Sequence, residues 1–174
     1  VTRTSFTGAP DRSTMQVVGS VITVGYTDTA GNPATAVVVY RDGTIMKATL
    51  RGSAIDGLGA SIAPIVDDSG TVIQFTTLPG TSGERTYRAS VIGSSGRSLT
   101  VSSTDLPGAP VGQPVVASSG VAYVISDAGR TSWLTVLNSS LTTLPTVAVP
   151  DGLRPEDLVT DATNRRVGFV VADP

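Results

Sequence analysis

The residues best suited to chemistry in this chain are its carboxylates, because the usual bases and soft metal ligands are missing. The 174 residues contain no His and no Cys, so a Ser-His-Asp triad, a thiolate nucleophile and the common zinc sites cannot be built. Two carboxylates suffice to hydrolyse a glycoside, and the adjacent acidic pairs are Asp67-Asp68 and Glu156-Asp157. Neighbours on a strand point to opposite faces, so Asp67 and Asp68 would cooperate only across a bulge.

Both acidic pairs have simpler interpretations. We expect Asp67-Asp68 to form a turn or to protect a strand edge, with calcium binding and catalysis as the alternatives. Glu156-Asp157 follows Pro155 and is expected to favour the start of a short turn.

A few other side chains could bind or react. Ser-Lys catalysis would need Lys47, but this residue alternates with Met46 and Ala48, so we expect a solvated side chain. Trp133 is the sole tryptophan and could stack on a sugar or anchor a protein contact; we expect it to fill a gap between sheets instead. Similar packing, with the hydroxyls at a wet rim, is expected of the tyrosines Tyr26, Tyr40, Tyr87 and Tyr123.

The remaining polar motifs are expected to be turns. Arg165-Arg166 lies beside Asn164, and Asn138-Ser139-Ser140 matches a glycosylation sequon; both are typical of solvated loops. No phosphate-binding or dinucleotide-binding glycine motif occurs. The sequence therefore predicts no catalytic, cofactor-binding or metal-binding residue, no cofactor, and a protein that is not an enzyme.

Composition limits the partners. A net charge of -2 gives no electrostatic reason to bind nucleic acid, and no apolar run reaches the length of a membrane span. Eleven of the twelve basic residues are Arg; because they are scattered, we interpret them as a compositional bias rather than a recognition surface. With 40% hydrophobic, 15% charged and 5% aromatic residues, the chain is expected to fold into many short strands.

An internal repeat is the strongest structural signal. Residues 64–70 return as residues 114–120, with Pro, Val, Ser and Gly repeated 50 positions later. An apolar strand follows each copy, at residues 72–75 and 121–124, and similar strands occur at residues 21–24 and 167–170. Self-similarity at this period is typical of stacked β units.

The repeat predicts how the chain is organised. Residues 1–12 are expected to form an arm or edge strand, followed by a single β-repeat domain at 13–174. Its units are expected at about 13–56, 57–106, 107–152 and, as a partial unit, 153–174. Each full unit offers four strands, and Asp42-Gly43 supplies a hairpin turn in the first. The only candidate helix is a single turn at residues 154–157.

These paired strands and the Pro64/Pro114 copies resemble the blade repeats of β-propeller proteins. The resemblance covers residues 13–171 and implies an all-β fold, a propeller-like array of about three and a half four-stranded antiparallel units. The alternative is a β-sandwich of the kind found in virion tail and capsid proteins.

The expected function follows from the missing reactive groups and the abundance of strands. We expect a non-catalytic structural or binding module, for scaffolding or partner recognition in an extracellular or phage-particle assembly. Its partner would be another protein or a second copy, and its location extracellular, on a cell surface or in a virion. The alternative is a segment of a secreted carbohydrate-active or carbohydrate-binding propeller protein, so carbohydrate is a possible ligand.

Overall fold

All the regular structure of the protein is β-strand. A computed structural model describes residues 5, 7–54, 56–57, 60–61, 64–66, 70–79, 84–116, 122–128, 131–137, 147–149, 155–160 and 167–171. Every strand pair in these segments is antiparallel, and none of these residues is helical, which confirms the predicted all-β class. Nowhere in the described segments is there a helix with the length and apolar character needed to cross a membrane.

The first two sheets are built from residues 8–105. The first sheet has the order β1-β2-β3-β4, with bounds β1 (Gly8–Val18), β2 (Val21–Asp28), β3 (Pro33–Arg41) and β4 (Thr44–Arg51). The second sheet has the order β11-β10-β9-β5, and β8 also pairs with β9. Its bounds are β5 (Ser53–Ala54), β8 (Ile65–Val66), β9 (Val72–Pro79), β10 (Arg85–Ser95) and β11 (Ser98–Asp105).

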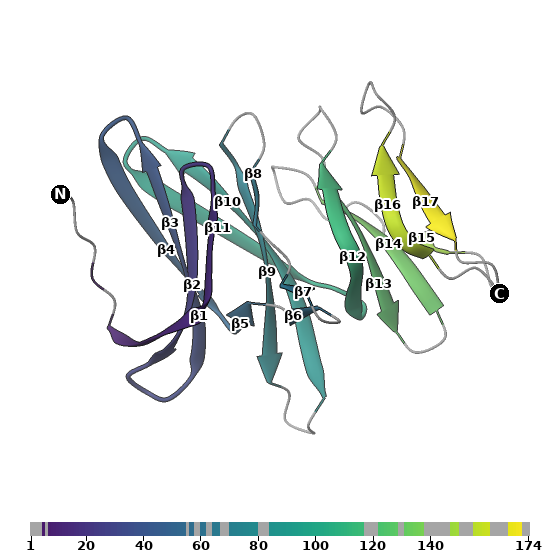
Figure 1. Cartoon of the computed structure of the whole chain (residues 1–174), viewed down its shortest axis with the longest axis horizontal. Coiled ribbons are helices and arrows are strands. Elements are labelled where there is room, and N and C mark those ends of the chain that lie inside the picture. Colours follow the sequence, from purple (N-terminus) through teal and green to yellow (C-terminus); the bar gives the residue numbers. More distant parts are fainter. Residues whose placement is uncertain are drawn as a thin grey trace.

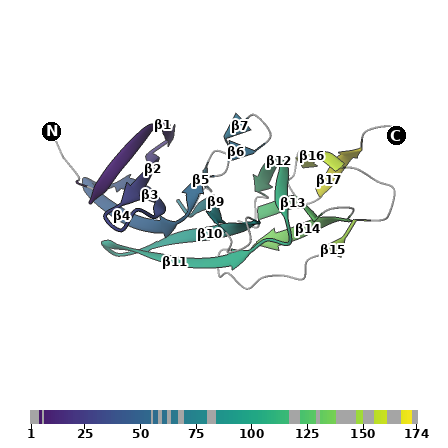
Figure 2. The same ribbon diagram turned by 90° about the horizontal axis from the view of Figure 1, so that it is seen from below.

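The remaining strands form the third sheet and two hairpins. The third sheet has the order β12-β13-β14-β15, with β12 (Ala109–Val116), β13 (Ala122–Ala128), β14 (Thr131–Leu137) and β15 (Val147–Ala148). The hairpins are β6 (Asp56–Gly57) with β7 (Ala60–Ser61), and β16 (Pro155–Thr160) with β17 (Val167–Val171). Figures 1 and 2 show an open row, with the first sheet at one end and β16–β17 at the other.

Both faces of the second sheet are buried. On one face Val72 and Ile92, which are register partners, pack with Val37 and Val39 of the first sheet. On the other face Phe75 and its register partner Ala89 pack with Val124 of the third sheet. We call the face toward the earlier sheet the back face and the face toward the later sheet the forward face. Burial on both faces explains why β9 begins with five consecutive buried residues.

This layering differs from a two-layer sandwich, in which inward-facing residues alternate with outward-facing polar residues along each strand. The second sheet instead lies between the first and third sheets in Figure 2. Hairpins and small sheets are marginally stable alone, so each sheet depends on its neighbours for burial. The propeller-like array expected from the sequence is a finer arrangement than this open row of described strands, and it remains a proposal.

The register of the pairs corrects how the repeats align. Ile65 pairs with Ile73 and Val115 pairs with Tyr123, so the 50-residue offset continues through the second strand of each unit. The strands expected at residues 72–75 and 121–124 begin 49 positions apart, one residue short of this register. A one-residue slip moves every side chain to the other face. In the correct register Phe75 corresponds to Ile125, and both are fully buried.

Three local expectations also differ from the structure. The expected boundary at residue 12 falls inside β1, whose first residues pair with β2 before a register shift. β5, assigned to the first unit, pairs with β9 of the second sheet. The turn expected at residues 154–157 is wrong from Pro155 onward, because β16 begins there and pairs with β17. An acidic pair after proline is compatible with an irregular strand start, and the register shifts at this point.

Gly52 joins the first sheet to the second. Its φ of +95° is rarely adopted by residues with a side chain, and a Cβ there would overlap the backbone carbonyl of Thr77. Its N–H donates to the Pro33 carbonyl at 2.9 Å, and its carbonyl accepts from the Thr35 hydroxyl at 2.9 Å. The link between sheets therefore requires glycine at this position.

We expect Gly52→Ala to lower the free energy of unfolding by about 2–3 kcal/mol, because both the backbone strain and the overlap with Thr77 oppose the native conformation. Gly43→Ala is the matched control: its φ is +75°, but no atom lies within 4 Å of the added Cβ, so about 1–2 kcal/mol is expected. Urea denaturation measures both. Equal losses would show that Gly52 has no special role between the sheets.

Buried threonines allow a second matched comparison. Thr35 is 0% exposed and donates its hydroxyl to Gly52, whereas Thr23 is 1% exposed and its hydroxyl has no hydrogen-bond partner among the described residues. We expect Thr35→Val to destabilise the fold by about 1–2 kcal/mol and Thr23→Val to be neutral or stabilising by up to about 1 kcal/mol. Thermal unfolding of both variants tests this, and a loss at Thr23→Val as large as at Thr35→Val would contradict it.

Candidate binding site

The acidic pairs predicted from the sequence do not form a described site. Asp67 and Asp68 lie outside the described residues, as do Asn138-Ser139-Ser140 and Asn164-Arg165-Arg166. Glu156 and Asp157 are consecutive on β16. Among the described residues, no group of three or more His, Cys, Asp or Glu side chains could hold a metal ion.

Lys47 and the aromatic residues occupy varied positions. Lys47 is exposed, and its Nζ donates to the Ser5 carbonyl at 2.7 Å. Trp133 is half-buried and pairs with Ser126 on the back face of the third sheet. Tyr40 is 54% exposed, so the expectation that it packs inside is wrong; it lies on the back face of the first sheet, which no described sheet covers. The other three tyrosines are half-buried.

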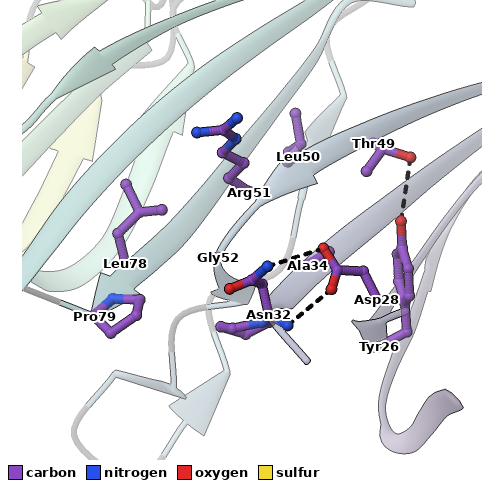
Figure 3. A pocket seen from close by; sticks show the side chains of 11 residues that line it. Tyr26, Asp28, Asn32, Ala34, Thr49, Leu50, Arg51, Gly52, Leu78 and Pro79 are labelled. Carbon is purple, nitrogen blue, oxygen red and sulfur yellow. Dashed lines mark hydrogen bonds between the residues drawn. The ribbon is translucent and has the colours of Figure 1, made fainter. Parts of the chain in front are cut away.

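The structure instead brings polar groups together in a cavity that the sequence did not predict. The cavity encloses about 470 Å³ at the ends of β2, β4 and β9, a size typical of small-molecule sites. Figure 3 shows the side chains that line it. They are Tyr26, Asp28, Asn32, Pro33, Ala34, Thr49, Leu50, Arg51, Gly52, Leu78 and Pro79.

One wall of the cavity is fixed by the turn between β2 and β3. The Asp28 carboxylate accepts hydrogen bonds from the backbone N–H groups of Asn32 at 2.8 Å and Ala30 at 2.9 Å. The Asn32 side-chain amide donates to its other oxygen at 3.5 Å. The Asn32 backbone bond is the main cause that lowers the pKa of Asp28 below its ordinary value of 3.8, with the bonds from Ala30 and the Asn32 side chain adding to it.

This lowered pKa predicts an acid sensitivity. The carboxylate stabilises the folded state at pH values above its unfolded pKa, and that contribution is lost as the pH falls through the lower folded pKa. We therefore expect Asp28→Asn to lower the melting temperature at pH 6 and to match the wild type once Asp28 is protonated. A melting-temperature difference that does not narrow as the pH falls below the ordinary Asp pKa of 3.8 would contradict this, because Asp28 becomes protonated in that direction.

The opposite part of the cavity carries an available cation. Arg51 is exposed, and its side chain forms no hydrogen bond or ion pair with any residue that the structure describes. Its side chain extends away from Asp28 and Asn32 in Figure 3. Leu78 and Pro79, at the end of β9, supply an apolar surface beside it. Between these parts, the Tyr26 hydroxyl donates to Thr49 at 3.4 Å.

The arrangement can bind but offers no described reactive pair. A guanidinium recognises carboxylate or phosphate groups through its planar fork of donors. Hydroxyl and amide groups opposite can hydrogen-bond a polar ligand, while Pro33, Leu50 and Pro79 exclude water from part of its surface. Among the lining residues that the structure describes, Asp28 is the only carboxylate, whereas glycoside hydrolysis by the usual route needs two.

Comparisons with known proteins leave the site to be interpreted from its geometry. No protein-family model, curated protein or solved structure matched this chain.

Proposed function

We propose that this protein is a non-catalytic structural module that associates with a second copy of itself through the back face of its first sheet. The observation that carries the proposal is an exposed apolar patch on that face, formed by Met15, Val17, Ile22 and Tyr40. Their exposed fractions are 57%, 61%, 39% and 54%. Contiguous apolar patches on soluble proteins commonly mark interaction sites.

The stacking of sheets indicates what would cover this patch. The back face of the second sheet is covered by the first sheet, and the back face of the third is covered by the second. Val21 and Val39 lie on the forward face of the first sheet, where they pack against the second sheet. Ile22 and Tyr40 are the next residues along the same strands, so their side chains lie on the back face. A sheet of the same kind fits such a face, and a second copy of the chain supplies one.

Association of this kind is compatible with the propeller-like array expected from the sequence. In a repeat array each added unit buries the exposed apolar face of the unit before it. When two copies join head to tail, so that different faces meet, repeated contacts close a ring or extend a filament. The setting we expect, outside a cell or in a virion, belongs to the same proposal and rests on the sequence alone.

Sedimentation equilibrium tests the proposal. We expect the wild-type chain in solution to have a mass that is a multiple of 17.7 kDa. Val17→Glu should shift the mass toward that of a single chain, because removing the new carboxylate from water on association is costly. Val101→Glu is the control, since Val101 is 42% exposed on β11, outside the patch. A wild-type chain that stays monomeric at every concentration, or equal effects of both variants, would refute self-association through this face.

A further inference from the structure

We propose that the cavity at the ends of β2, β4 and β9 binds a carboxylate-bearing sugar, such as a uronate residue of an acidic oligosaccharide, with Arg51 as the residue that recognises the carboxylate. This inference rests on other residues than the self-association proposed above, although by register Tyr26, Thr49 and Arg51 lie toward one end of the same back face of the first sheet.

The charge of the cavity favours an acidic group at Arg51. The guanidinium forms no interaction with a described protein group, so its donors do not have to give up a protein partner to bind a ligand. Asp28 does not neutralise it: the pair makes no ion pair within 4.0 Å, and the carboxylate is already held by the turn. A carboxylate fits the fork of Arg with two parallel hydrogen bonds.

The rest of the lining favours a ring that carries hydroxyl groups. Thr49 and Asn32 present a hydroxyl and an amide, which can both donate and accept. Tyr26 is half-buried, and its ring borders the cavity; an aromatic ring provides an apolar face for a sugar. Leu78 and Pro79 form a second apolar surface near Arg51.

The shape of the site favours a short oligosaccharide over a single acidic sugar. Arg51 and Leu78 lie in one part of the cavity and Tyr26 in another in Figure 3. The volume of about 470 Å³ lies within the range of sites for small organic ligands. A ligand with its carboxylate at Arg51 and a neighbouring ring toward Tyr26 would use both parts.

Isothermal titration calorimetry with a galacturonate trisaccharide, and with the matching neutral galactose trisaccharide, tests the proposal. We expect only the acidic ligand to bind, with affinity falling as salt is raised because the exposed guanidinium is screened. Arg51→Gln should weaken binding by at least about tenfold, the loss expected for a hydrogen bond between charged groups. Arg97→Gln is the matched control, because Arg97 is also exposed but lies in the turn between β10 and β11, away from the cavity.

The Arg51→Gln variant separates a loss of binding from a loss of folding. The Arg51 side chain makes no hydrogen bond or ion pair with a described residue, so Arg51→Gln is expected to unfold at the wild-type temperature, and binding can be compared directly. Thr49→Val is the second variant; it should weaken binding without changing the salt dependence. The proposal is overturned by equal binding of the two trisaccharides, by absence of binding to the acidic one, or by equal effects of Arg51→Gln and Arg97→Gln.

Discussion

Phe75→Ala is expected to lower the free energy of unfolding by about 3–5 kcal/mol, the largest loss from any single substitution considered for this chain. Phe75 is 0% exposed and is among the largest fully buried side chains. It packs on the forward face of the second sheet with Ile73, Val91 and Val124. Removing the ring leaves a cavity between the second and third sheets, and the lost contacts come from both.

This loss is a large fraction of the total stability of a typical small domain, about 5–15 kcal/mol, so the variant is best measured in stabilising salt. Phe75→Leu keeps much of the volume and should cost roughly 1.5 kcal/mol or less. Val101→Ala is the surface control; Val101 is 42% exposed and lies outside the apolar patch, and a change within about 0.5 kcal/mol is expected. A loss at Phe75→Ala no greater than that at Val101→Ala would show that the second and third sheets do not pack through Phe75.

Strand patterns allowed much of the local fold to be predicted. The apolar run from Ala36 to Val39 predicted a buried strand, and β3 is buried over these residues. Asp42-Gly43 predicted a tight hairpin, and both residues have positive φ in the turn between β3 and β4. These features depend on backbone preferences and burial within a few residues, which the sequence records directly.

Features that depend on distant contacts were not predictable in the same way. The strands expected at residues 72–75 and 121–124 miss the true offset by one residue because apolar residues stand at neighbouring as well as at alternate positions in both. When both faces of a strand are buried, hydrophobicity no longer distinguishes them, and the period of two is lost. The pairing of β5 with β9 depends on Gly52 and its bonds to Pro33 and Thr35, which no local pattern indicates.

The cavity was also beyond the reach of sequence patterns. Its lining comes from the turn at Asp28 and Asn32, the end of β4, and the end of β9 at Leu78 and Pro79. Arg51 had been interpreted as part of a general arginine bias, since nothing in its sequence neighbourhood separates it from the other arginines. Its availability follows only from the positions of all charged groups around it.

The second large prediction compares two isoleucines on opposite faces of the second sheet. Ile73 is 3% exposed and packs on the forward face with Val124, whereas Ile92 is 1% exposed and packs on the back face with Val37. They lie on the neighbouring strands β9 and β10. Each Ile→Ala substitution is expected to cost about 2–5 kcal/mol, because each removes a side chain from a separate core.

The two sites should be only weakly coupled. Ile73 and Ile92 occupy adjacent register positions on paired strands, but their side chains point to opposite faces, so the double variant should lose roughly the sum of the single losses, with a coupling energy of about 0.5–1 kcal/mol. If the sum exceeds the stability of the protein, Ile→Val substitutions at the same positions, each costing about 0.5–1.5 kcal/mol, keep the comparison measurable.

Urea denaturation of this isoleucine pair tests most directly the claim that stacked sheets cover both faces of the second sheet. The stacking predicts similar, large losses of unfolding free energy at Ile73 and Ile92. A large loss at one position with a loss below about 0.5 kcal/mol at the other, as expected for a residue facing solvent, would contradict it.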